Sequence, residues 1–129
     1  TVSMTTMADP RTLTREFMRE AWRAYLGVRN EAHDSSYAVP ARAETLANLP
    51  PTLIVAAELD PLRDEAVHYA NQLWQAGCSC ELHVLRGAIH GFDALVPDAP
   101  MAKTMLTVIV DNLKRELRAA GDRPMSSGS

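Results

Sequence analysis

The chain is organised around the segment Leu49-Pro-Pro-Thr-Leu-Ile-Val-Ala-Ala-Glu-Leu-Asp-Pro-Leu-Arg-Asp-Glu65. Its unbroken apolar run from Thr52 to Ala57 predicts a strand buried on both faces, because a half-exposed strand would alternate apolar and polar residues. Asp60 and Pro61 follow this strand after Glu58 and Leu59, and they open a predicted helix. In open parallel sheets, functional groups lie where strands end at their carboxyl edge. We therefore expect Asp60 to lie at such an edge.

A second segment, Gly87-Ala-Ile-His-Gly-Phe92, follows a second predicted strand, Cys80 to Arg86. Between the two strands, apolar residues recur every three or four positions from Leu62 to Ala76, which predicts a helix that Gly77 stops. A strand, a crossing helix and a second strand form a βαβ unit, so the two strands should lie parallel. His90 then also lies at the carboxyl edge.

Two further helices are predicted. Arg11 to Gly27 has apolar residues at helical spacing, and Gly27 stands where a C-terminal cap belongs. A last helix starts at Pro100 and runs along apolar positions to Leu117. The other segments are predicted to be a loop over Thr1 to Asp9, a connection over Val28 to Asn48 with a short turn around Ala43 to Leu46, a loop over Gly87 to Ala99, and a frayed tail over Gly121 to Ser129.

Length and composition exclude several classes of protein. The 129 residues have the size of one domain, and a content of 47% hydrophobic and 22% charged residues is typical of a soluble globular protein without a membrane span. The net charge of -3, with scattered Lys and Arg residues, provides no basic stripe for nucleic acid. The chain starts at Thr1 without a visible secretion signal, so we expect a cytoplasmic protein.

No cofactor or metal ion is expected. Cys78 and Cys80 are separated by one residue, a poor geometry for an intrastrand disulfide, and they are interpreted as small buried apolar residues. The histidines other than His90 show no metal-ligand spacing. The glycines are isolated turn residues that form no phosphate-binding loop.

Two parallel strands are too few for an independent sheet. A strand that is apolar on both faces, such as Thr52 to Ala57, needs a hydrogen-bonded neighbour on each edge, and the sequence offers one. We therefore expect the chain to be the C-terminal part of a larger α/β sheet. Its partner would be the missing N-terminal part or a second copy of the chain.

Several segments of the sequence, taken together, are similar to one known protein family. The segment Pro50 to Glu65, followed by Tyr69-Ala-Asn-Gln-Leu73, Ala76-Gly77 and His90-Gly-Phe92, resembles the end of a hormone-sensitive-lipase-family carboxylesterase, an α/β-hydrolase. The resemblance covers roughly Arg11 to Leu117. It implies that the two strands are the last two of an eight-stranded sheet.

The resemblance also implies functional roles. Asp60 and His90 match two members of a Ser-His-Asp triad and would come together at the carboxyl edge, with an ester as the small-molecule substrate. The helix around Trp22 matches part of the cap over the acyl pocket, so Phe17, Trp22 and Phe92 are candidate pocket or lid residues. The implied organisation is a cap-type helix and connection over residues 1–48, the C-terminal βαβα part of the hydrolase core over residues 49–120, and a tail over residues 121–129.

The chain departs from the family in two motifs. The nucleophile elbow G-x-S-x-G and the upstream HGG-type oxyanion loop are both absent. None of its serines has glycines at both flanking positions of that motif; they are Ser3, Ser35, Ser36, Ser79, Ser126, Ser127 and Ser129. The sequence thus carries the base and the residue that orients it, without the nucleophile.

Alternative interpretations remain open at this point. Asp60 before Pro61 is also the pattern of a plain helix N-cap, and His90 could be an ordinary loop histidine. The helix around Trp22 could simply pack in the core. The chain is either the His and Asp part of a serine carboxylesterase, active only when joined to the missing part, or a non-catalytic hydrolase-like module for binding or dimerisation.

Overall fold

The computed structural model describes residues 1–7, 13–27 and 36–121. Contacts divide the chain into two compact units, Thr1–His90 and Gly91–Ser129. Each unit is described by itself.

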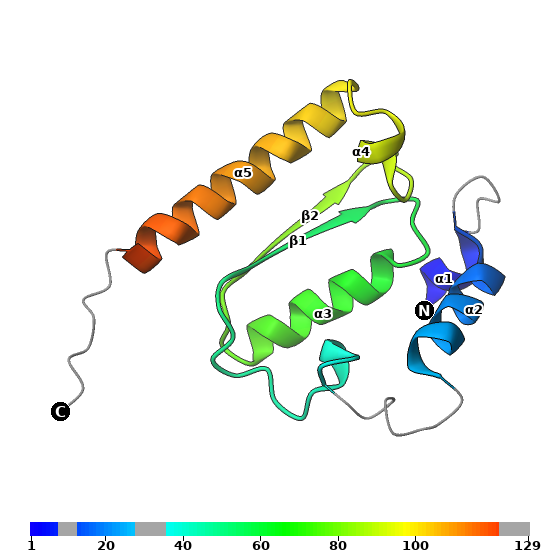
Figure 1. Cartoon of the computed structure of the whole chain (residues 1–129), viewed down its shortest axis with the longest axis horizontal. Coiled ribbons are helices and arrows are strands. Elements are labelled where there is room, and N and C mark those ends of the chain that lie inside the picture. The colour runs from blue at the N-terminus through cyan, green and yellow to red at the C-terminus, as the bar shows by residue number, and fades with distance from the viewer. Residues whose placement is uncertain (8–12, 28–35, 122–129) are drawn as a thin grey trace. The chain divides into compact units, whose positions relative to one another are not determined.

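The first unit contains a two-stranded parallel sheet. Strand β1 (Thr52–Ala57) pairs with strand β2 (Cys80–Leu85) from Thr52 opposite Cys80 to Ala57 opposite Leu85. Helix α3 (Arg63–Gln75) connects the strands and runs alongside both of them (Figure 1). The predicted βαβ unit and the parallel pairing are confirmed.

The core lies between α3, the sheet and the chain that leads into β1. Leu73 of α3 is fully buried and clusters with Leu46 and Cys78. Half-buried residues complete the cluster: Ala43, Ile54, Tyr69, Ala76 and Cys80. Both cysteines are free thiols; Cys78 is buried as predicted, whereas Cys80 is only half-buried because it lies at the start of β2. Burial raises the pKa of the Cys80 thiol.

β1 is less buried than its sequence predicts. Only Ala56 and Ala57 at its end are buried, while the four residues before them are half-buried. Within the described residues, β1 pairs with β2 alone, so its other edge has no strand neighbour. The apolar pattern of a central strand and this incomplete sheet together indicate a partial α/β fold.

The N-terminal segment corrects one prediction. The expected loop over Thr1 to Asp9 contains a short helix, α1 (Val2–Thr6), which contacts α3 (Figure 1). The Thr1 side chain caps α1 by accepting a hydrogen bond from the Met4 backbone N–H. Tertiary hydrogen bonds, described below, hold this helix in place.

Helix α2 (Arg15–Leu26) confirms the predicted amphipathic helix within the described residues. Thr14 caps it by accepting a hydrogen bond from the Phe17 N–H at 3.1 Å, and Gly27 ends it with a φ of 71°. The connection to β1 has its helical turn earlier than predicted, in the 3-10 helix η2 (Pro40–Arg42), where Pro40 fixes the φ of the first position.

The second unit contains helix α4 (Phe92–Leu95) and helix α5 (Pro100–Gly121). α5 starts at Pro100, as predicted, but it includes Gly121, which the sequence pattern places in the tail. The expected loop over Gly87 to Ala99 is interrupted by α4, which at four residues is too short to leave a periodic pattern in the sequence. The remainder of the predicted tail lies outside the described residues.

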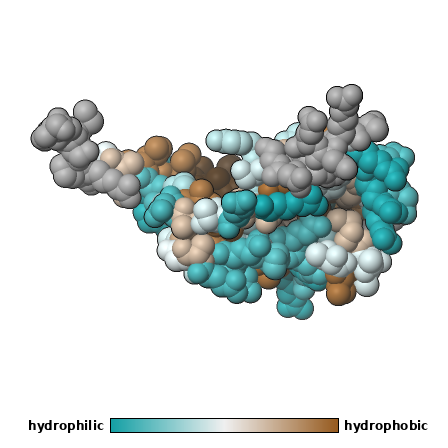
Figure 2. Space-filling model, turned by 90° about the horizontal axis from the view of Figure 1, so that it is seen from below, coloured by the Kyte–Doolittle hydropathy of each residue, from teal (hydrophilic) through white to brown (hydrophobic). Residues whose placement is uncertain are grey.

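Much of the apolar surface of α5 is exposed. Hydrophobic side chains of this helix are visible in Figure 2. The exposed apolar residues of α5 include Leu106, Ile109, Leu113 and Leu117. No helix in the described ranges has the length and apolar character needed to cross a membrane.

Candidate active site

Asp60 lies in a turn between the end of β1 and the start of α3. Asp60 as a whole residue is 7% exposed, and its Oδ1 accepts a hydrogen bond of 2.9 Å from the backbone N–H of Leu62. The Asp60 carbonyl accepts another, of 3.0 Å, from the Arg63 N–H. α3 therefore begins at Arg63 with Leu62 as its N-cap, later than the predicted start, and Asp60 is not a plain helix N-cap.

The second carboxylate oxygen of Asp60 faces His90. Asp60 Oδ2 lies 2.8 Å from His90 Nδ1, which confirms the predicted contact between the two residues. The aspartate side chain is 10% exposed and the histidine side chain is 44% exposed. An ionised carboxylate only accepts hydrogen bonds, so this contact favours the tautomer with its proton on Nδ1 and leaves the lone pair on Nε2. Such a ring can take up a proton at Nε2 while the carboxylate stabilises the imidazolium.

Three hydrogen bonds join the segment after β1, which carries Asp60, to the end of β2 and the loop after it, which carries His90. The N–H of Glu58 donates to the Leu85 carbonyl at 3.0 Å, and the N–H of Leu59 donates to the Ala88 carbonyl at 2.9 Å. The Glu58 side chain accepts from the N–H of Gly87 through Oε2, at 2.6 Å. Hydrogen bonding between the two segments thus continues beyond the ends of β1 and β2. These bonds fix the position of the Asp60 segment relative to the His90 loop.

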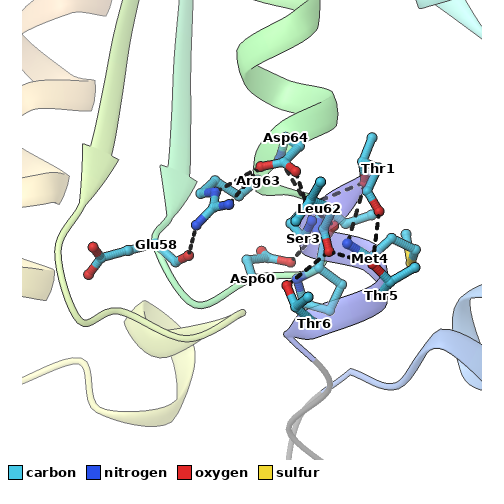
Figure 3. Close-up of polar contacts among 12 residues, drawn as sticks. Thr1, Ser3, Met4, Thr5, Thr6, Glu58, Asp60, Leu62, Arg63 and Asp64 are labelled. Atoms are coloured by element: carbon cyan, nitrogen blue, oxygen red, sulfur yellow. Dashed lines mark hydrogen bonds and ion pairs between the residues drawn. The ribbon is translucent and has the colours of Figure 1, made fainter.

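A polar network flanks Asp60 on the side of α1 (Figure 3). The Asp64 carboxylate accepts hydrogen bonds from Arg63 Nε and Nη2 on Oδ1, at 2.9 and 2.8 Å, and from the Ser3 N–H on Oδ2, at 2.7 Å. The Ser3 N–H first, and then the Arg63 guanidinium, hold the pKa of Asp64 below its ordinary value. The network therefore contains an ionised carboxylate at neutral pH.

The same network reaches the backbone on both sides of Asp60. Ser3 Oγ donates to the Pro61 carbonyl at 2.7 Å, and Arg63 Nη1 donates to the Glu58 carbonyl at 3.0 Å. Ser3 is fully buried, and its hydroxyl also accepts from the Asp64 N–H at 3.2 Å. The sequence patterns assign no such role to Ser3, Arg63 or Asp64.

Phe17 and Trp22, the two candidate lid residues in the first unit, do not line one common cavity within the described residues. Trp22 is 38% exposed and lines a cavity of about 460 Å³ with residues that include Leu26, Pro40 and His68. Phe17 is 59% exposed, at the first turn of α2, and is not among the residues that line this cavity. Neither Asp60 nor His90 lines it. Phe92 is buried on α4, in the second unit.

The described parts of the chain hold no group of three or more His, Cys, Asp or Glu side chains arranged to bind a metal ion. His83 has a carboxylate partner of its own, Glu81, with Nε2 and Oε1 at 2.7 Å. Both residues lie on β2, so this pair is separate from the one at the carboxyl edge.

Comparisons with known proteins agree on one family. A family model described as alpha/beta hydrolase fold matches residues 1–94. The esterase LipI of Mycobacterium tuberculosis is 41% identical over 63 residues, which are 49% of this chain and 20% of the relative. The ethyl acetate hydrolase of Pseudomonas putida is 35% identical over 78 residues, 60% of this chain and 24% of the relative.

Solved structures give the same result over more of the chain. A structure titled bacterial heroin esterase matches with a TM-score of 0.82 and 42% identity, covering 91% of this chain and 38% of that one. The esterase LipW of Mycobacterium marinum matches with a TM-score of 0.75 and 38% identity, covering 81% and 32%. The chain spans about a quarter or less of the two curated relatives named above.

Proposed function

The chain belongs to the α/β-hydrolase family, in its hormone-sensitive-lipase branch, and on this premise we propose that it is the part of a carboxylic ester hydrolase that carries the His and Asp of a Ser-His-Asp triad. In this proposal His90 is the general base and Asp60 orients it. The contact of 2.8 Å between His90 Nδ1 and Asp60 Oδ2 is the single observation that supports the proposal most strongly.

The geometry of the pair suits acyl transfer. With the Nδ1 proton directed at Asp60, His90 Nε2 is able to accept the proton of an attacking serine hydroxyl and to return it to the leaving alcohol. Asp60 stays ionised and stabilises the imidazolium that forms between these two steps. The 44% exposure of the His90 side chain leaves the ring accessible to a nucleophile and a substrate.

The nucleophile would come from residues outside these 129. No serine of the chain has the G-x-S-x-G surroundings that expose its oxygen on a sharp strand-to-helix turn. The backbone donors of an oxyanion hole belong to the same missing motifs. Loss of one such donor typically lowers turnover about 100- to 1000-fold, so the chain alone should be inactive as an esterase.

Helix α2 is the candidate lid of this site. Its aromatic side chains Trp22 and Tyr25 pack edge to face with ring centroids 5.9 Å apart, and both are partly exposed. With Met18 and Ala21 they line an apolar hollow on α2, a surface of the kind that contacts an acyl chain. Phe92, which follows the His90-Gly91 pair in sequence, stays a candidate pocket residue on the family resemblance alone.

The experiment compares the purified chain with a version extended in frame through a G-x-S-x-G segment. Hydrolysis of short p-nitrophenyl esters should be measurable for the extended protein and, for the chain alone, no faster than the reaction given by a surface histidine. A burst of p-nitrophenol from the chain alone, abolished by His90→Ala, would contradict the proposal because it would reveal a nucleophile within the chain.

A further inference from the structure

The segment around Ser3 lies far from Asp60 in sequence but next to it in the structure. Asp60 stands between two backbone carbonyls that other side chains hold. The Glu58 carbonyl, two residues before it, accepts from Arg63 Nη1, and the Pro61 carbonyl, one residue after it, accepts from Ser3 Oγ. These contacts restrain the turn that carries the Asp60 carboxylate from both sides.

The two anchoring groups are themselves joined by Asp64. Its carboxylate accepts from the guanidinium of Arg63 on one oxygen and from the Ser3 N–H on the other. A second hydrogen bond joins the same two residues, because Ser3 Oγ accepts from the Asp64 N–H. Ser3, Arg63 and Asp64 therefore form one network with Asp64 at its centre, which we call the Asp60 clamp (Figure 3).

We propose that the Asp60 clamp positions the Asp60 carboxylate so that it selects one tautomer of His90, and that Ser3 is its positioning residue contributed from α1. The Ser3 hydroxyl is suited to this because it is fully buried and is used as both donor and acceptor. Removal of the hydroxyl leaves a buried carbonyl without its partner, and the turn is then free to adjust. A movement of the turn would move the Asp60 carboxylate and so change its contact with His90 Nδ1.

The inference rests on the proposed function only for the catalytic use of the pair. Its own prediction concerns which ring nitrogen of His90 carries the proton. That property is measurable without a nucleophile, substrate or turnover. Failure of the esterase proposal and failure of the clamp proposal are therefore separate results.

The test uses the full chain with 15N-labelled histidine, studied by NMR at alkaline pH, where imidazole rings are neutral. Ring nitrogen shifts distinguish the Nδ1–H from the Nε2–H tautomer, and His90→Ala identifies the His90 signals. Ser3→Ala should lower the ratio of the two tautomers at His90 by about two- to tenfold, the factor that one hydrogen bond represents. The matched control is Thr5→Ala, because Thr5 Oγ1 bonds only to carbonyls of its own segment. It should leave the ratio unchanged.

His83 is the internal control, since its ring nitrogen has its own carboxylate partner, Glu81, on the same strand β2. Its ratio should be the same in every variant. In an Asp60→Ala background, Ser3→Ala should produce no further change at His90, because the two substitutions act through the same contact. An unchanged His90 ratio in Ser3→Ala, or an equal change at His83, would overturn the proposal.

A second variant covers the case in which Ser3→Ala does not fold. In Arg63→Lys, a single ammonium group replaces the guanidinium that bonds both Asp64 and the Glu58 carbonyl. This variant should lower the tautomer ratio of His90, as Ser3→Ala does. Loss of the fold in both variants, followed by circular dichroism, would also overturn the proposal. The network would then determine folding rather than the state of His90.

Discussion

The side chain of Glu58 accepts a hydrogen bond of 2.6 Å from the backbone N–H of Gly87, and this contact joins the loop of Asp60 to the loop of His90. Gly87 has a φ of 72°, a left-handed conformation that favours glycine, so its N–H is presented at a sharp turn directly after β2. One side chain thus spans the carboxyl ends of both strands.

Glu58→Ala should loosen the His90 loop. Loss of one hydrogen bond at this exposed position should increase amide hydrogen exchange at Gly87 up to about tenfold. Glu58→Gln retains an acceptor oxygen and should keep exchange near the value of the unchanged chain. Equal acceleration in both variants would show that the charge of Glu58, rather than its hydrogen bond, holds the loop.

The low pKa of Asp64 makes stability depend on pH. The folded-state pKa lies below the ordinary value of 3.8, so the unfolded chain binds a proton first as the pH falls. The contribution of Asp64 is therefore fully present above that value and is lost as the pH falls through the lower, folded-state pKa. In urea unfolding, the stability difference between the unchanged chain and Asp64→Asn should be constant at neutral pH and shrink below about pH 4. A difference that grows as the pH falls would contradict this sign.

Leu73 should be the most sensitive core position of α3. It is 0% exposed and packs against Leu46 and Cys78, so Leu73→Ala should lower the free energy of unfolding by about 2 to 5 kcal/mol. Val67 on the same helix is 38% exposed, and Val67→Ala should change the free energy by less than about 0.5 kcal/mol. Denaturant titrations of the two variants check the contrast. Similar losses would show that the core is not centred on Leu73.

The outer edge of β1 should make the isolated chain associate. Because β1 pairs with β2 alone among the described residues, the chain should either self-associate or bind the missing part of the hydrolase. Sedimentation velocity should show species larger than one chain, or assembly when the complementary segment is added. A monodisperse monomer with a cooperative calorimetric melt would contradict this expectation.

The parallel sheet and the position of Asp60 and His90 at one sheet edge follow from local patterns, while the direct contact between the two residues is expected from the family resemblance alone. An apolar run, a helical period and a second apolar run leave parallel pairing as the favoured arrangement, which brings the residues after each strand to one edge. Asp60 and His90 occupy such positions. The resemblance to a known family supplied their chemistry.

The Asp60 clamp could not be predicted in this way. Ser3 contacts Pro61 and Asp64, which lie 58 and 61 positions further along the chain. No periodicity of the sequence connects residues so far apart. For the same reason α1 was expected to be a loop, since tertiary contacts rather than helix propensity hold its five residues. The sequence context of Asp64 indicates only an acid in the first turn of a helix.

The most direct test of the central claim is kcat/KM for ester hydrolysis by the complete protein, with His90→Ala compared with His83→Ala. His83 is the matched control because it also lies within 2.7 Å of a carboxylate oxygen, at Glu81 on β2. We expect kcat/KM to fall about 10⁴-fold or more for His90→Ala, and to stay close to the wild-type value for His83→Ala. Full activity of His90→Ala, or equal losses in both variants, would contradict the assignment of His90 and Asp60 to the triad and would favour a non-catalytic module.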